Sequence, residues 1–191
     1  MKTIKTLSIA GALLLCCVVY SGTASGQAVR KQYVADIGAA FTQATVTKAQ
    51  GGMLGLDLSA GKMFTNGLSV GFMVGYDVVS YQKDEEIYER LAIVPILARA
   101  KYYFTLSSAM QLHAMAGGGA YQTIPHLGTI PIGGVSRAEL RPGGSIGVGF
   151  DWWVFGSQGL GAEFEYNFFD SGAEDLFSYF SLRLNYSIIK M

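Results

Sequence analysis

The sequence predicts an all-β protein, an eight-stranded antiparallel up-and-down transmembrane β-barrel, and three observations lead to this fold class. Apolar residues alternate with small or polar residues through most of the chain, which is the period of a β-strand. Glycine is frequent, at 25 of 191 residues, and aromatic residues make up 13%. Only 15% of the residues are charged, which is few for a domain surrounded by water.

The N-terminal segment has the pattern of a secretory signal peptide. Two lysines open it, an apolar stretch covers 7–20, and small residues follow directly. We therefore expect a signal peptide over 1–26 and a barrel domain over 27–191. Cys16 and Cys17 both fall in the signal, so we expect no disulfide and no thiolate metal ligand in the mature domain. An uncleaved anchor helix is the alternative interpretation of this stretch.

Eight segments show the alternation expected of strands with one apolar face and one polar or small face. The fourth is ambiguous in its facing, because 91–98 is apolar on both faces and contains Pro95. A β-bulge or a locally apolar lumen would explain it. The expected strands span approximately 31–42, 52–64, 68–81, 88–103, 109–122, 138–153, 159–169 and 176–189.

The expected connections differ in length between the two ends of the barrel. Asn66-Gly67 is a strong signal for a tight turn in the second connection. In an outer-membrane barrel the short turns face the periplasm and the longer loops face outward. We therefore expect residues 82–87 and 123–137 to lie outside the cell, where they would meet an extracellular ligand. The odd-numbered connections are expected at 43–51, 82–87, 123–137 and 170–175, and the even-numbered ones at 65–67, 105–108 and 154–158.

The kind of residue on each face decides which solvent surrounds the barrel. Leucine, valine, phenylalanine and tyrosine occupy one face, and glycine, serine and a few charges occupy the other, which suits lipid outside and a crowded lumen inside. A soluble, lipocalin-like barrel is the alternative, with its charges in water and its apolar face around a cavity. The charges expected to face the lumen and to pair there are Arg141, Arg183, Glu163, Glu165, Asp57 and Asp151, together with Asp36, Asp77, Glu139, Arg99 and Lys101.

Aromatic residues cluster near the ends of the expected strands, as in the two aromatic girdles of membrane barrels. Near the periplasmic turns they include Phe64, Tyr102, Tyr103, Phe104, Trp152 and Trp153. Near the outer loops they include Tyr81, Tyr88, Tyr121, Phe168, Phe169, Phe177 and Tyr179.

Two segments resemble the outer-membrane β-barrel domain family, the small OmpA/OmpX-like eight-stranded barrels of the type common in Bacteroidetes. Residues 94–104 combine a proline, an apolar run and a basic-Tyr-Tyr-Phe end, and residues 115–121 form a glycine-rich strand. The resemblance implies an eight-stranded barrel in the outer membrane of a Gram-negative bacterium, inserted by the barrel-insertion machinery. The chain departs from many such barrels at its C-terminus, which ends in Lys190-Met191 where they have an aromatic residue.

No motif in the sequence points to catalysis, a cofactor or a metal. Small membrane barrels include lipid A-modifying enzymes, and a deacylase of that kind would use a histidine and a serine two residues apart. Neither His113 nor His126 is followed by serine at that spacing. His113 is expected to fill the lumen, and His126 to lie in the longest outer loop. No cluster has metal-ligand spacing, and the formal net charge of +0 does not indicate a nucleic-acid partner.

We therefore expect a non-enzymatic integral outer-membrane barrel with a structural or surface-interaction role through its outer loops. Outer-membrane lipid and the insertion machinery are its expected partners. A narrow, porin-like pore or small-ligand transport barrel is the first alternative, supported only by the polar lumen. A lipid A-modifying enzyme is the second, and the missing His-x-Ser pair disfavours it.

Overall fold

The computed structural model describes residues 32–45, 53–64, 67–84, 87–125, 139–154, 157–173 and 175–190. The expected signal peptide and its two cysteines lie outside the described residues. Within the described ranges, no helix is both long and apolar enough to cross a membrane. The strands are β1 (Gln32–Ala44), β2 (Met53–Met63), β3 (Leu68–Asp84), β4 (Ile87–Thr105), β5 (Met110–Pro125), β6 (Glu139–Trp153), β7 (Gln158–Ala173) and β8 (Asp175–Lys190).

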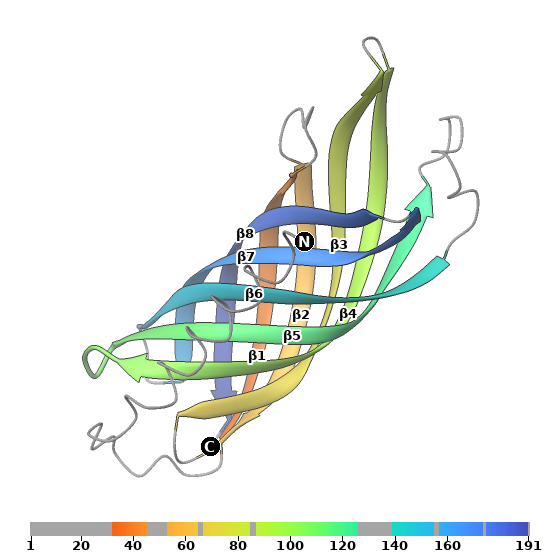
Figure 1. Cartoon of the computed structure of the whole chain (residues 1–191). Coiled ribbons are helices and arrows are strands. Elements are labelled where there is room, and N and C mark those ends of the chain that lie inside the picture. Colours follow the sequence, from red (N-terminus) through yellow and green to blue (C-terminus); the bar gives the residue numbers. More distant parts are fainter. Residues whose placement is uncertain are drawn as a thin grey trace, which may run out of the picture.

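The eight strands form one closed antiparallel barrel in sequence order (Figure 1). Each strand pairs with the next, and β1 closes the sheet by pairing with β8, from Tyr33↔Lys190 to Ala44↔Tyr179. Closure removes the unpaired sheet edges that an open sheet would expose. The eight-stranded up-and-down prediction is confirmed, and every strand end lies within four residues of its expected position.

Large apolar side chains point away from the barrel axis along every strand. Leu54 and Phe72 are 75% and 72% exposed, and leucines, valines, isoleucines and phenylalanines at alternate positions share this outward face. The residues between them are buried in the lumen, where Asp36, Ser145 and Asn167 represent the polar side chains. Because bulky apolar groups face outward and polar groups face inward, the outer surface suits hydrocarbon.

Strand β4 keeps the same alternation through Pro95. Leu91, Ile93 and Leu97 are buried inside, whereas Ile96 is 44% exposed outside. The pairing of β4 with β5 runs without a shift from Leu91↔Pro125 to Thr105↔Gln111, so no bulge accompanies the proline. Of the two explanations expected for this strand, the structure has the locally apolar lumen.

The two rims of the barrel differ in their connections. We call the turn rim the end where β1 begins, β8 ends and residues 64–67, 106–109 and 154–157 connect strands. The loop rim is the opposite end. Gly67 has a φ of 80° in the turn after β2, a conformation that glycine adopts without the strain of a side chain.

The loop rim shows where the expected connection lengths need correction. Strands β3 and β4 continue to Asp84 and from Ile87, so most of the expected loop 82–87 is strand, and β7 likewise continues into the expected loop 170–175. The β3–β4 hairpin extends well beyond the neighbouring strands (Figure 1). No turn signal in residues 82–87 distinguishes a loop from a long hairpin, so the sequence alone did not predict the longer strands. Most of the expected loop 123–137 lies outside the described residues.

Candidate functional site: a charge cluster in the lumen

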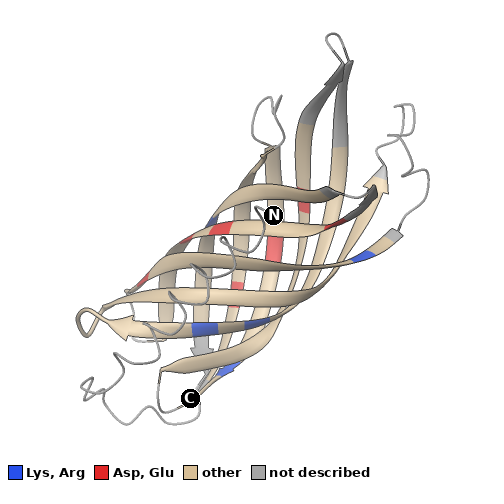
Figure 2. Ribbon diagram, in the orientation of Figure 1, with Lys and Arg blue, Asp and Glu red and all other residues tan. Residues whose placement is uncertain are grey.

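Ten ionisable side chains meet in the middle of the barrel, and every strand contributes at least one. Each is less than 9% exposed. Figure 2 shows charged positions on the middle stretches of strands all around the barrel. We call these residues the lumen charge cluster: Asp36, Asp57, Asp77, Arg99, Lys101, His113, Asp151, Glu163, Glu165 and Arg183.

Arg183 of β8 binds three carboxylates from three other strands. Its Nε donates to Glu165, its Nη1 to Asp57 and its Nη2 to Asp77, each at 2.9 Å. The hydroxyl of Tyr179 also donates to Asp77, at 2.9 Å. The planar guanidinium presents donors in fixed directions, so it can hold several carboxylates at once where lysine would act as a point charge.

Two cations of β4 hold the opposite side of the cluster. Arg99 pairs with Glu165 through Nη2 and lies 3.6 Å from Glu163 through Nη1. Lys101 Nζ donates to Glu163 at 2.6 Å and to Asp36 at 3.2 Å. Because residues 99 and 101 alternate with outward positions, one strand directs both cations inward.

His113 of β5 lies between two carboxylates. Its Nδ1 is 3.1 Å from Asp151, and its Nε2 is 3.2 Å from Glu163. The ring is also 5.2 Å from that of Tyr103, at an interplanar angle of 53°. Both ring nitrogens thus face acids inside the lumen, away from any lipid-facing surface.

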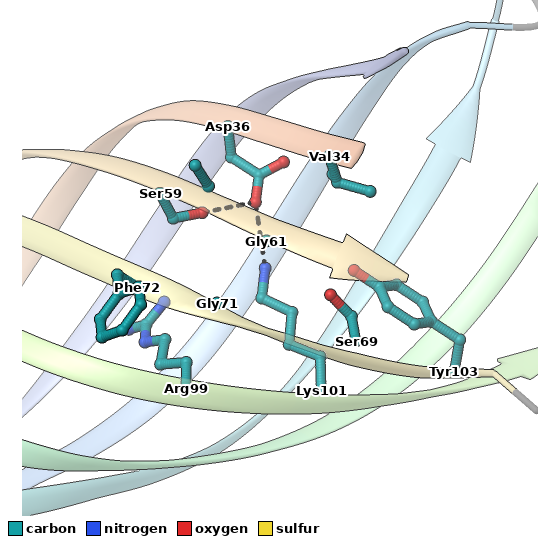
Figure 3. Close-up of a pocket in the computed structure, with 11 residues that line it drawn as sticks. Val34, Asp36, Ser59, Gly61, Ser69, Gly71, Phe72, Arg99, Lys101 and Tyr103 are labelled. Carbon is teal, nitrogen blue, oxygen red and sulfur yellow. Dashed lines mark hydrogen bonds and ion pairs between the residues drawn. The ribbon is translucent and has the colours of Figure 1, made fainter. Parts of the chain in front are cut away.

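A small cavity lies beside the cluster near the turn rim, among β1, β2, β3 and β4 (Figure 3). Lys101 and the Ser59 hydroxyl both reach Asp36 across it, the latter at 2.7 Å. Gly61 and Gly71 lie on its wall. Asp36, Arg99 and Lys101 of the lumen charge cluster therefore line one side of the cavity.

Apolar layers lie in the lumen on both sides of the cluster. Towards the loop rim, Tyr121 stacks on Phe169 with 5.0 Å between ring centroids. Its hydroxyl donates to the Gly144 carbonyl at 2.8 Å. This layer, the apolar plug, consists of Ala44, Met73, Val79, Leu91, Ile93, Leu97, Tyr121, Phe169 and Tyr179. Towards the turn rim, Val34, Met63 and Tyr103 form a second, smaller apolar layer.

The structure brings together five of the six charges expected to form the main lumen network. Asp57, Asp151, Glu163, Glu165 and Arg183 are all in the cluster. Arg141, which was expected to pair in the same network, is half-buried and lies outside this cluster. Glu165 opposes Gly147 on β6, and Arg141 is six residues from Gly147, about 20 Å at the rise of a strand. Arg99 and Lys101 supply the cations in its place.

The expected aromatic girdles also need correction. At the turn rim Tyr102, Phe104 and Trp152 lie on the outward face, but Tyr103 is buried inside. Trp153 also has inward parity, and its Nε1 donates to Gln111 at 3.1 Å. At the loop rim, the residues that were expected in the girdle but point inward are Tyr121, Phe169, Phe177 and Tyr179. The physical reason is the alternation of strand side chains, so adjacent aromatics such as 102 and 103 cannot share one face.

The side chains of the lumen charge cluster pack the lumen and neutralise one another's charge, and their arrangement does not indicate a catalytic or metal-binding role. No group of acids, histidines or cysteines among the described residues is arranged to hold a metal ion. His126, the other histidine considered from the sequence, lies outside them. The buried cluster fills a narrow lumen, which matches the expectation that an eight-stranded barrel is packed by side chains.

Solved structures of small outer-membrane barrels are similar to this fold. Neisserial surface protein A (NspA) superposes with a TM-score of 0.56 at 19% identity, covering 82% of this chain and 96% of that protein. The chain has the fold of small outer-membrane β-barrels. Ail, the attachment invasion locus protein of Yersinia pestis, superposes with a TM-score of 0.53 at 15% identity, covering 85% of this chain and 100% of Ail.

A third similar structure is outer membrane protein AlkL in lipid bilayers, with a TM-score of 0.50 and 14% identity over 88% of this chain and 94% of AlkL. No protein-family model matches the chain, and no curated protein matches it. These likenesses confirm the predicted small-barrel fold. The resemblance to the Bacteroidetes type stays a prediction.

Proposed function

We propose that this chain is an integral outer-membrane protein with a sealed lumen, and that its role is structural or one of surface contact at the loop rim. The outward face carries this proposal. Large apolar side chains are exposed on all eight strands, and in water such a surface would drive association. A closed barrel is one of the two backbone structures that satisfy their hydrogen bonds inside lipid.

The packed lumen favours a structural or contact role over a pore. Arg183, Glu165, Tyr121 and Tyr179 are fully buried across its middle and its loop-rim half. A solute would have to displace both the lumen charge cluster and the apolar plug. The β3–β4 hairpin projects past the rim (Figure 1), and in the proposed orientation it would meet molecules outside the cell.

A lipid-modifying enzyme is not supported by the described residues. His113 is enclosed by Asp151, Glu163 and Tyr103 in the lumen, where no acyl chain in the membrane can reach it. We propose a non-enzymatic protein whose partners are outer-membrane lipid, the barrel-insertion machinery and an extracellular ligand at the loop rim.

Membrane fractionation and gel migration test this proposal. The full chain, expressed with its residues 1–26 in a Gram-negative host, should shorten at its N-terminus and fractionate with the outer membrane. Purified protein should migrate differently in gels before and after boiling. Planar bilayers containing it should show no stepwise conductance. Recovery from the soluble periplasm would contradict the membrane proposal, and regular conductance steps would favour the pore.

A further inference from the structure

One lysine lies between two aromatic rings on the outer surface at the turn rim. The Nζ of Lys62 is 5.9 Å from the centroid of the Tyr33 ring and 5.9 Å from that of Phe64. The two rings are 59% and 39% exposed. Aromatic faces attract a cation at this distance. The rings therefore hold the ammonium at the rim, and its N–H groups can also point away from the barrel.

Within the described part of the chain, the charge of Lys62 is isolated on this surface. Among the outward side chains that the structure describes, Lys62 is the one base, and the one acid is Asp170 at the opposite rim. No acid in the described ranges forms an ion pair with Lys62. Tyr33 pairs in register with Lys62 on one side and with Lys190 on the other, so two lysine positions occupy one level of the barrel.

We propose that Lys62, Tyr33 and Phe64 form a binding site for the phosphate of a phospholipid in the leaflet at the turn rim. This inference rests on the proposed membrane location. A phosphate supplies a negative charge that the described outward side chains at this level do not provide. Val70 pairs with Lys62 on β3, and Ala60 is the next outward residue of β2, so both offer apolar surface to the acyl chains of the same lipid. Lysines near membrane ends characteristically extend their charge to the headgroups.

Native mass spectrometry of the full-length protein in detergent tests the site. The probes are phosphatidylglycerol, which carries the phosphate, and diacylglycerol, which lacks it. Wild type should retain phosphatidylglycerol preferentially. Lys62→Gln should lower that retention about fivefold, the factor expected for one basic residue at an anionic surface. Retention of diacylglycerol should not change, and Lys62→Arg should keep most of the preference.

Three results would overturn the inference: equal phosphatidylglycerol retention by wild type and Lys62→Gln, equal loss in Lys62→Arg, or displacement of the lipid by inorganic phosphate alone. Liposome flotation and heat-modifiable migration of every variant show whether the protein has inserted into a membrane. They therefore distinguish a failure of the phosphate site from a failure of the proposed function. Wild-type protein that does not enter liposomes overturns both. Inserted wild type and Lys62→Gln that retain the lipid equally overturn only the phosphate site.

Discussion

At the scale of single residues, Arg183 is the side chain on which the lumen charges most depend. Six carboxylates of the cluster share three fixed cations and one histidine, so none of the cations is in excess. Arg183 alone contacts three of those acids. Removing one partner of a buried ion pair leaves the other charge without compensation in a poorly solvated environment.

Arg183→Met should therefore destabilise the folded barrel by about 3–5 kcal/mol, the usual cost of breaking a buried pair. The measurement is the urea midpoint of unfolding in liposomes, followed by heat-modifiable migration. Arg183→Lys keeps the charge but loses the three-way geometry, so its midpoint should fall between those of wild type and Arg183→Met.

Leu182→Met is the matched control, because this neighbouring residue faces outward and is 48% exposed. Its midpoint should stay close to that of wild type. An unchanged midpoint in Arg183→Met would show that the cluster contributes little to the stability of the barrel.

The sequence could predict which charges face inward but not which of them meet. Alternation along a strand assigns a residue to a face, and this placed Asp57, Glu163 and Arg183 in the lumen. The height of a residue along the barrel axis depends on the stagger between strands, which is fixed only when the sheet closes. Arg141 has the correct parity but the wrong height, whereas Arg99 has both.

At the scale of elements, the pairing of β2 with β3 depends on a close approach at Gly71. The two strands pair directly at Gly61↔Gly71. A Cβ added at Gly71 would lie 2.2 Å from the carbonyl oxygen of Ala60, which is backbone and cannot move independently. Only glycine fits where one strand approaches another this closely.

Gly71→Ala should lower the stability of the barrel by about 1–3 kcal/mol, the range for overpacking. Gly118→Ala is the matched control, since an added Cβ there would meet only the Gly143 carbonyl oxygen at 4.0 Å. The same urea titration in liposomes compares the two variants. If Gly71→Ala unfolded at the midpoint of Gly118→Ala, the close approach would not constrain the sheet.

Strand β4 shows what the sequence of a single element cannot settle. Its apolar stretch 91–98 fits lipid or lumen equally well, so alternation does not assign its facing. The structure puts Ile93 and Leu97 inside because Tyr121, Phe169 and Tyr179 from other strands complete an apolar layer there. This layer draws residues from six strands and exists only after they have been assembled, so no local pattern within β4 reveals it.

The facing of β4 can be checked by methyl NMR in nanodiscs that contain a lipid with a nitroxide in its acyl chain. The methyl signal of Ile96 should broaden strongly, as should that of Ile146, because both point outward. The signal of Ile93 should broaden less, since this side chain is fully buried in the apolar plug. Equal broadening of Ile93 and Ile96 would contradict the assigned facing.

At the scale of the whole molecule, the surrounding solvent decides how much a charge placed on the outward face destabilises the barrel. In water, an exposed apolar residue can be replaced by a charged one with an effect usually within about 0.5 kcal/mol. In lipid, arginine at the bilayer midplane costs about 2–4 kcal/mol, falling to about 0–1 kcal/mol near the interfaces. Depth-dependent sensitivity to charge therefore distinguishes a membrane barrel from a lipocalin-like barrel of the same topology.

Two exposed positions at different heights make this comparison possible. Val148 lies near the middle of β6, and Leu176 lies near the start of β8 at the loop rim. Val148→Arg should lower the free energy of unfolding in liposomes by about 2–4 kcal/mol, and Leu176→Arg by at most about 1 kcal/mol. Both side chains avoid the lumen, so neither change disturbs the charge cluster directly. If Val148→Arg were as stable as Leu176→Arg, the outward face would not lie in hydrocarbon, and the barrel would have to be soluble despite its exposed leucines and phenylalanines.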